Sequence, residues 1–195
     1  GPDAHAREGT VDKEGHGIAS FDYTKLDSDG NELPVDAGDW SCVRDNKTGL
    51  IWEVKTTDGG LRDEGSVYSW YQPDGPNNGD PGRRNLRHAP CSGSECNTHS
   101  YVEAVNDEGL CGASDWRMPT VNEMHSLTYQ GRQGYSNQHT PTIDTDFFPN
   151  TRTNFYWTGT PSAEDSRDAW LVLFMSGHDE VEGGRCRRVA NVRAV

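Results

Sequence analysis

The sequence lacks long apolar runs, has few aliphatic residues and is short of positive charge. A membrane-spanning helix needs about 20 consecutive apolar residues, and no such run occurs, so we expect no membrane insertion by this segment. Lys and Arg total 18 against 31 Asp and Glu, which gives a net charge of −13. A surface this acidic repels phosphate groups, and this argues against binding to nucleic acid or to anionic membrane surfaces.

Leu, Ile, Val and Phe together number 30 of the 195 residues. This share lies below the ~20% level that, with high net charge, is typical of disordered chains. We nevertheless expect a folded chain, because six Trp, seven Tyr and five Cys have little use in a solvated coil. The length fits one domain, which we place at residues 21–195. Residues 1–20 are expected to form a flexible arm, and its Gly1-Pro2 has the form of a tag-cleavage scar.

Five cysteines in an acidic, Trp-rich chain predict disulfides and an extracytoplasmic location, either secreted or at the cell surface. A zinc site is disfavoured because four residues separate Cys91 from Cys96, where a CxxC pair would have two. We expect one bridge between Cys91 and Cys96 and a second between Cys42 and Cys111. Cys186 competes for either partner, since an odd number leaves one thiol over.

Local patterns predict an α+β fold with strands at both ends and two short helices in the middle. Apolar residues at helical spacing predict a helix from Thr98 to a glycine cap at Gly109. A Thr120…Glu123 capping box after Pro119 predicts a second helix. A Gly- and Pro-rich loop is expected between them and the preceding strands, over residues 72–90. Strands are predicted within 21–34, in a hairpin over 40–54, and at 154–158, 169–175 and 184–195.

The segments that carry a family resemblance are spread along the whole chain. They include NKTGLIWE from Asn46, GLCGASDWRMPT from Gly109 and FFPNT from Phe147, followed by FYWTGT and AWLVLFMSG. Taken together, residues 21–195 resemble the C-terminal domain family of the Legionella collagen-like adhesin. Relatives of this family include variable proteins of diversity-generating retroelements.

The resemblance implies a C-type-lectin-like fold, with two short helices packed on a mainly antiparallel sheet and an irregular, loop-rich second sheet. It also implies a bacterial secreted or surface-anchored protein that binds a ligand without catalysis. The expected partner is a glycan or protein of a host or neighbouring cell, with sulfated glycosaminoglycans as one glycan class. The alternatives are a retroelement variable protein that binds a protein ligand, and a purely structural surface module.

Two short motifs resemble calcium sites, although we expect no cofactor. Gln72-Pro73-Asp74 matches a triplet that calcium-dependent lectins use for galactose, but here it precedes the first helix, where those lectins carry it after the second. Asp27-Ser-Asp29-Gly-Asn31-Glu32 offers closely spaced oxygens, but the glycine and glutamate of an EF-hand fall out of register. Both are predicted to be turns.

A catalytic site is not predicted. The seven histidines are scattered, without a Gly-x-Ser-x-Gly elbow or a His-Glu-x-x-His pair. Formylglycine-generating enzymes share the broader lectin-like fold but work through a pair of C-terminal cysteines, and the last third of this chain has only Cys186. An enzyme remains the alternative class.

The ligand-binding face is expected on the loops and outward side chains of the last strands. Tyr, Trp and short polar residues suit such a face, because they give contact area at low entropic cost. Trp157 is assigned to the core. The candidate residues are Asn154, Tyr156, Thr160, Glu164, Asp165, Arg167, Trp170, His178, Asp179 and Arg185. Sulfate recognition would need arginines. Two clusters contain them: Arg83, Arg84 and Arg87, and Arg185, Arg187 and Arg188. Acidic neighbours balance the charge of the second cluster.

Overall fold

The computed structural model describes most of the chain beyond residue 20. The expected arm over residues 1–20, apart from Gly17, lies outside the described residues, and so does Cys186. Residues 178–182 and 189 are described by their backbone. The described residues are 17, 21–74, 81–84, 90–92, 95–129, 140–163, 168–176, 178–182 and 189–195.

The first half of the chain forms a four-stranded antiparallel sheet in the order β2-β1-β3-β4. The predicted hairpin is confirmed, with Val43 of β3 opposite Trp52 of β4. Its turn is held by Asp45, whose carboxylate accepts hydrogen bonds from the backbone of Lys47 and the hydroxyl of Thr48. The strands are β1 (Tyr23–Leu26), β2 (Glu32–Leu33), β3 (Cys42–Asp45) and β4 (Ile51–Glu53).

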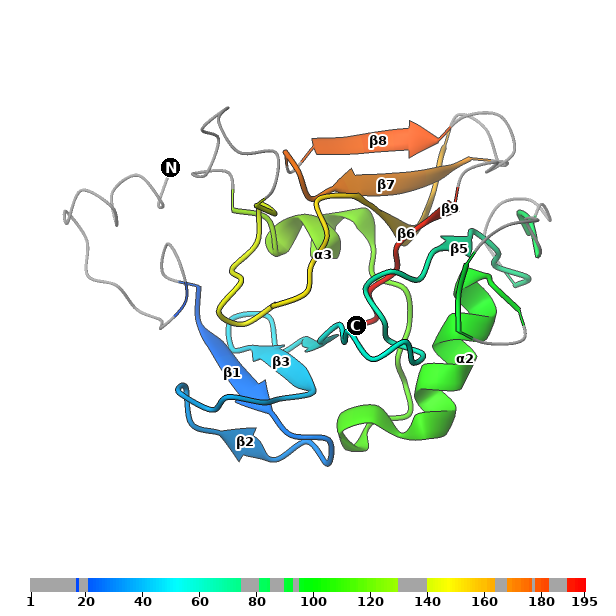
Figure 1. The fold of residues 1–195 in the computed structure, drawn as a ribbon. Coiled ribbons are helices and arrows are strands. Elements are labelled where there is room, and N and C mark those ends of the chain that lie inside the picture. Colours follow the sequence, from blue (N-terminus) through cyan, green and yellow to red (C-terminus); the bar gives the residue numbers. More distant parts are fainter. Residues whose placement is uncertain are drawn as a thin grey trace.

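The last third of the chain forms a three-stranded antiparallel sheet in the order β6-β7-β8. It consists of β6 (Phe155–Pro161), β7 (Ala169–Leu173) and β8 (His178–Glu182). The central place of β7 agrees with its apolar sequence. A further pair joins β5 (Tyr68–Ser69) to β9 (Val189–Ala190). In Figure 1 the three-stranded sheet lies above the four-stranded one, and the C-terminal segment runs between them.

Both predicted helices are confirmed, together with their caps. Helix α2 (Thr98–Glu108) begins after Asn97, whose side chain accepts from the backbone of Ser100, and ends at Gly109 with φ of 62°. A short 3-10 turn, η2 (Leu110–Gly112), follows. Helix α3 (Val121–Ser126) begins at the capping box of Thr120 and Glu123. Within the described residues, no helix is long and apolar enough to span a membrane.

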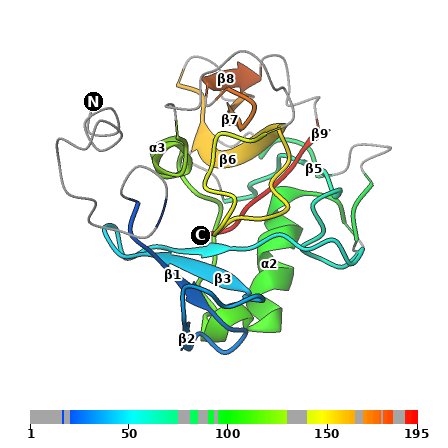
Figure 2. The same ribbon diagram turned by 60° about the vertical axis from the view of Figure 1, so that its left-hand side comes forward.

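Two apolar cores lie on opposite faces of the central strands. Trp157 on β6 and Leu171 on β7 belong to the core that α2 covers. Their neighbours Tyr156 and Val172 belong to the core that α3 covers. Successive side chains of a strand point to opposite faces, so both faces of β6 and β7 are buried. Figure 2 shows α3 against the three-stranded sheet and α2 beside the four-stranded one.

Both expected disulfides are confirmed. The Cys42–Cys111 bridge joins β3 to η2 across 69 residues of chain. The Cys91–Cys96 bridge closes a loop directly before α2. The first bridge therefore fixes the four-stranded sheet to the end of α2, whereas the second is local.

The end of the chain differs from its prediction. Within 184–195, only β9 is a described strand, and residues 191–195 are irregular. Their backbone nevertheless bonds to distant elements. Glu53 on β4 donates to the carbonyl of Ala194 at 3.2 Å, and Arg117 and Val195 exchange two hydrogen bonds of 3.0 Å. Residues 191–195 form backbone hydrogen bonds with a different element at successive positions, so no continuous strand ladder forms.

Candidate functional site

The structure describes the side chains of four of the ten candidate residues. Asn154 is exposed, and its amide donates to Oδ1 of Asn191 at 3.0 Å. Trp170 on β7 is half-buried. Thr160 is also half-buried, and its hydroxyl accepts from the backbone of Val121 at 2.9 Å, at the first turn of α3. Asn154, Thr160 and Trp170 therefore retain some exposure, although two of the three side chains also make structural bonds.

Tyr156 lies inside the core and has no exposed surface. Its ring packs edge-on against Phe174, and its hydroxyl accepts from the backbone of Arg152 at 3.1 Å. Burial raises the pKa of this hydroxyl. The expectation that the outward side of β6 faces a ligand is wrong at Tyr156, because helix α3 and its core cover that side.

The other candidates are described less fully. His178 and Asp179 belong to β8, where the structure gives the backbone alone. Glu164, Asp165, Arg167 and Arg185 lie outside the described residues. The same holds for Arg87, Arg187 and Arg188 of the two arginine clusters.

Both calcium-like motifs form turns, as predicted. Asp27 Oδ1 accepts from the backbone of Asp29 and Asn31, and Oδ2 accepts from the Asn31 side chain. These bonds, chiefly those from Asn31, lower the pKa of Asp27. Pro73-Asp74 is likewise a turn. Within the described part of the chain, no three His, Cys, Asp or Glu side chains gather as metal ligands would.

An open cleft of about 370 Å³ lies between the start of α2, the segment before α3 and β6. Its size falls within the range of small-molecule sites in proteins. Apolar groups supply much of the surface, with polar groups at intervals around it. The lining residues are Trp70, Tyr71, Gln72, Thr98, His99, Val102, Arg117, Met118, Thr120 and Gly159.

The aromatic wall of the cleft is held rigidly. Trp70 is buried, and its Nε1 donates to the carbonyl of Thr158 at 3.0 Å. The backbone of Tyr71 both donates to and accepts from the hydroxyl of Thr98, at 3.0 and 2.8 Å. Gly82 packs against the Trp70 ring at φ of 78°, and a Cβ there would lie 2.6 Å from the ring. Glycine is therefore required at this contact.

The ionic groups around the cleft are paired. Arg117 makes a two-pronged contact with Glu123, at 2.7 and 2.8 Å, which holds the pKa of Glu123 at about 2. Arg84 pairs with Glu95 at 2.8 Å and lowers the pKa of that carboxyl. His99 lies 3.3 Å from Glu103. Arg117, which lines the cleft, and Arg84, in the segment that follows Gly82, are therefore each matched by a carboxylate.

A protein-family model described as the Lcl C-terminal domain matches residues 41–195, which is more than half of the chain. The chain belongs to the Lcl C-terminal domain family. This agrees with the resemblance carried by the sequence motifs. No curated protein and no solved structure matches the chain.

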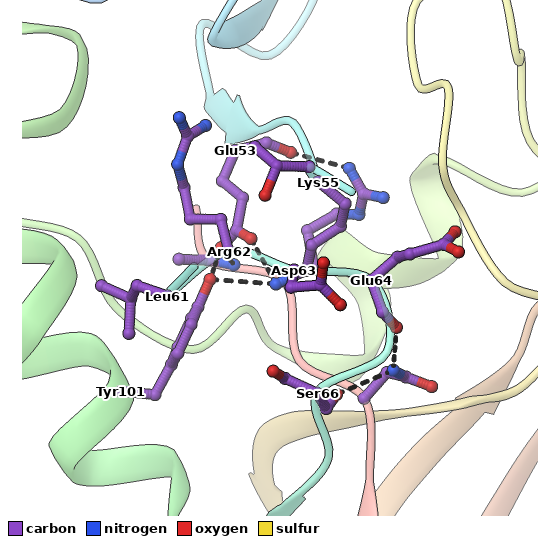
Figure 3. Close-up of polar contacts among 12 residues, drawn as sticks. Glu53, Lys55, Leu61, Arg62, Asp63, Glu64, Ser66 and Tyr101 are labelled. Atoms are coloured by element: carbon purple, nitrogen blue, oxygen red, sulfur yellow. Dashed lines mark hydrogen bonds and ion pairs between the residues drawn. The ribbon is translucent and has the colours of Figure 1, made fainter. Parts of the chain in front are cut away.

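A buried polar cluster lies where β4 meets α2. Figure 3 shows Glu53, Lys55 and Tyr101 converging from β4, the loop after it and α2. Lys55 forms an ion pair with Glu53 and donates to the Tyr101 hydroxyl at 3.0 Å, and that hydroxyl donates to Glu53. Burial lowers the pKa of Lys55 to about 8, against the opposing effect of Glu53. The three groups are buried, so we assign them a structural role.

Arg193 completes this cluster from the C-terminal segment. It has no exposed surface, and it donates to the carbonyl of Glu53 and to the hydroxyl of Thr151, both at 2.7 Å. Glu53 in turn accepts from the backbone of Ala194 at 2.8 Å. The C-terminal segment is thereby fixed to β4, and through Glu53 to Tyr101 of α2.

The cleft residues of the Lcl C-terminal domain were not among the sequence candidates. They come from four segments, near residues 70, 100, 118 and 159, that no local pattern connects. One signal was present, because Trp70-Tyr71-Gln72 places two aromatic residues beside an amide. Gln72 was predicted only as part of a turn that resembles a calcium-lectin triplet, and its aromatic neighbours were not among the candidates.

Proposed function

We propose that the chain is a non-catalytic, extracytoplasmic ligand-binding domain of adhesin type, secreted or displayed at a bacterial surface. Its partner is a glycan or protein on a host or neighbouring cell. Residues 21–195 act as one domain in this proposal.

Membership of the Lcl C-terminal domain family is the observation that carries the proposal. Two disulfides support an oxidising location, because thiols in the cytoplasm are kept reduced. The open cleft supports a binding role, because its lining pairs aromatic and apolar surface with separate polar groups.

The proposal includes a C-type-lectin-like fold. Two short helices and separate antiparallel sheets support it. The first described strands also approach the C-terminal segment, because β1 pairs with β3, β3 pairs with β4, and the backbone of Glu53 in β4 bonds to Ala194. A solved structure of this chain, superposed on lectin-like domains, tests this part.

Binding to a broad glycan array that includes sulfated polysaccharides tests the function, run once with calcium and once with a chelator. We expect saturable binding to a restricted set of glycans, with the same affinity in the presence of the chelator. We also expect the bound glycan to be recovered without cleavage, because the proposed function is non-catalytic. Binding confined to protein receptors would assign the partner to the protein class and would favour the variable-protein alternative over a glycan-binding adhesin. Absence of binding to both glycans and surface proteins would favour the structural module and refute the proposal.

A test of the loop face separates the variable-protein alternative from the adhesin type. Joint replacement of Asp165, Arg167 and His178 by Ala removes binding at an unchanged melting temperature if these side chains contact a protein ligand. A large fall in melting temperature would make them structural residues.

A further inference from the structure

We propose that the cleft beside Tyr71 binds a single neutral sugar ring, through stacking on the aromatic side chain and hydrogen bonds to the polar rim. The inference rests on the proposed ligand-binding function and deepens it, by naming the site and the class of sugar.

The shape of the cleft fits a ring of this size. Its volume of about 370 Å³ accommodates one hexose, with room for part of a second. Tyr71 is half-buried, so part of its ring remains available for contact. His99 lies edge-on to that ring, with 6.0 Å between the centroids. One face of a sugar ring is made of C–H groups, and an aromatic side chain offers a rigid surface for such a face.

Polar groups stand where ring hydroxyls need partners. Gln72, His99 and Thr120 are among the residues that line the cleft. The amide oxygen of Gln72 is buried and accepts no hydrogen bond from the described residues, so this amide has unused bonding capacity. A hydroxyl group both donates and accepts, and therefore suits a rim that mixes amide, imidazole and hydroxyl groups.

The charges of the rim favour a neutral sugar over a sulfated one. Arg117 and Arg84 are each engaged by a carboxylate, Glu123 and Glu95, at 2.7 and 2.8 Å. His99 faces a third carboxylate. A sulfate group would have to displace these carboxylates in a chain whose net charge is −13. A neutral sugar leaves these contacts undisturbed.

The cleft is also preorganised. Bonds from Trp70 to Thr158 and from Tyr71 to Thr98 hold its aromatic wall to β6 and α2. A wall that is already ordered loses little conformational freedom when a ligand binds.

Saturation-transfer NMR and calorimetry with methyl glycosides of glucose, galactose, mannose and N-acetylglucosamine test the proposal, with heparin as the sulfated comparison. We expect at least one neutral glycoside to bind, with an affinity that is unchanged between ~50 and ~500 mM salt. Tyr71→Ala removes the stacking surface and is expected to weaken binding about tenfold or more. Tyr71→Phe keeps the ring and is expected to retain most of the affinity.

Two further variants keep the test decisive. Val102→Phe on α2 fills the cleft from a half-buried position, and is expected to abolish binding even if Tyr71→Ala fails to fold. Trp170→Ala on β7 lies on the other candidate face and is expected to bind normally. The thermal transition of each variant establishes that it is folded.

The outcomes separate the site from the function. Binding of heparin alone, or of a neutral glycoside with equal affinity to wild type and Val102→Phe, overturns the cleft proposal and leaves the ligand-binding function standing. Loss of binding in Trp170→Ala but not in the cleft variants likewise overturns the cleft proposal and leaves the ligand-binding function standing. Absence of binding to all sugars and to surface proteins overturns both.

Discussion

Trp70 Nε1 donates a hydrogen bond to the carbonyl oxygen of Thr158, 3.0 Å away, and so joins the wall of the cleft to β6. The two residues are 88 positions apart in the sequence, and both are buried. The cleft is thus built on long-range bonds between the middle and the end of the chain. Its integrity depends on the same contacts that hold the fold together.

The first prediction concerns this bond. Trp70→Phe keeps an aromatic ring but leaves the buried carbonyl of Thr158 without its donor, so we expect a loss of about 1–2 kcal/mol in the free energy of unfolding. Trp40→Phe is the matched control, since Trp40 Nε1 donates to the carbonyl of Phe147 at 2.8 Å, away from the cleft. Urea denaturation should give similar losses for both, whereas only Trp70→Phe should weaken sugar binding. Equal binding by the two variants would contradict the assigned role of Trp70.

The two disulfides are predicted to contribute unequally. A bridge stabilises mainly by restricting the unfolded chain, and the effect grows with the length of the closed loop. Replacing both Cys42 and Cys111 by Ser, across a separation of 69, is expected to cost about 4 kcal/mol. The same change at Cys91 and Cys96, across a separation of 5, is expected to cost about 2 kcal/mol. Guanidinium denaturation of both double variants measures the difference, and a larger loss from the short loop would be inconsistent with this account.

The loss of folding stability at acidic pH should depend on Glu123. Its pKa is held at about 2 by the hydrogen bonds from Arg117, against 4.5 as its ordinary value. A lowered carboxyl pKa stabilises the fold above pH 4.5, and this contribution is lost as the pH falls from 4.5 through 2. Because the pair is partly exposed, Glu123→Gln is expected to lower the free energy of unfolding by about 1 kcal/mol at neutral pH. The stability of the variant should also fall less steeply between pH 4.5 and 2.

Chemical denaturation at a series of pH values measures this effect. Glu103→Gln is the control, because its exposed carboxylate lies 3.3 Å from the imidazole of His99 on the same helix and away from the Arg117–Glu123 pair. We expect that variant to stay within about 0.5 kcal/mol of wild type at neutral pH. An acid limb of unchanged slope in Glu123→Gln would refute the role of this pair.

The buried ion pair of Lys55 and Glu53 should be strongly coupled. Lys55→Met leaves the Glu53 carboxylate buried with one partner fewer, and is expected to cost about 3–5 kcal/mol. The double variant Lys55→Met/Glu53→Gln removes both charges, so it is expected to cost less than the sum of the single changes. A double-mutant cycle in urea gives the coupling, and strictly additive losses would show that the two groups act independently.

Sequence patterns predicted the parts of the fold that short segments determine. The predicted cap of α2 at Gly109 and the predicted capping box of α3, Thr120 and Glu123, are close in sequence to their helices, whereas the N-cap of α2 at Asn97 was not predicted. The hairpin of β3 and β4 follows from its turn. Strands β5 and β9 have two residues each and pair across more than 100 positions, so no local pattern marks them.

The candidate site was harder to predict because it, too, depends on contacts between residues that are far apart in the sequence. Tyr156 and Trp157 are adjacent aromatic residues, and the alternation of a strand says that they face opposite sides but not that both sides are covered. The burial of Tyr156 depends on α3, which lies about 30 positions earlier in the chain. The cleft likewise requires the meeting of four distant segments.

Hydrogen–deuterium exchange, measured with and without the glycan that binds most tightly on the array, locates the binding site within the fold. We expect slower exchange in the backbone around Tyr71 and His99, in the segment before α3, and at Gly159, with little change in the four-stranded sheet. Protection confined to β7 and β8, or unchanged exchange at saturating glycan, would contradict it.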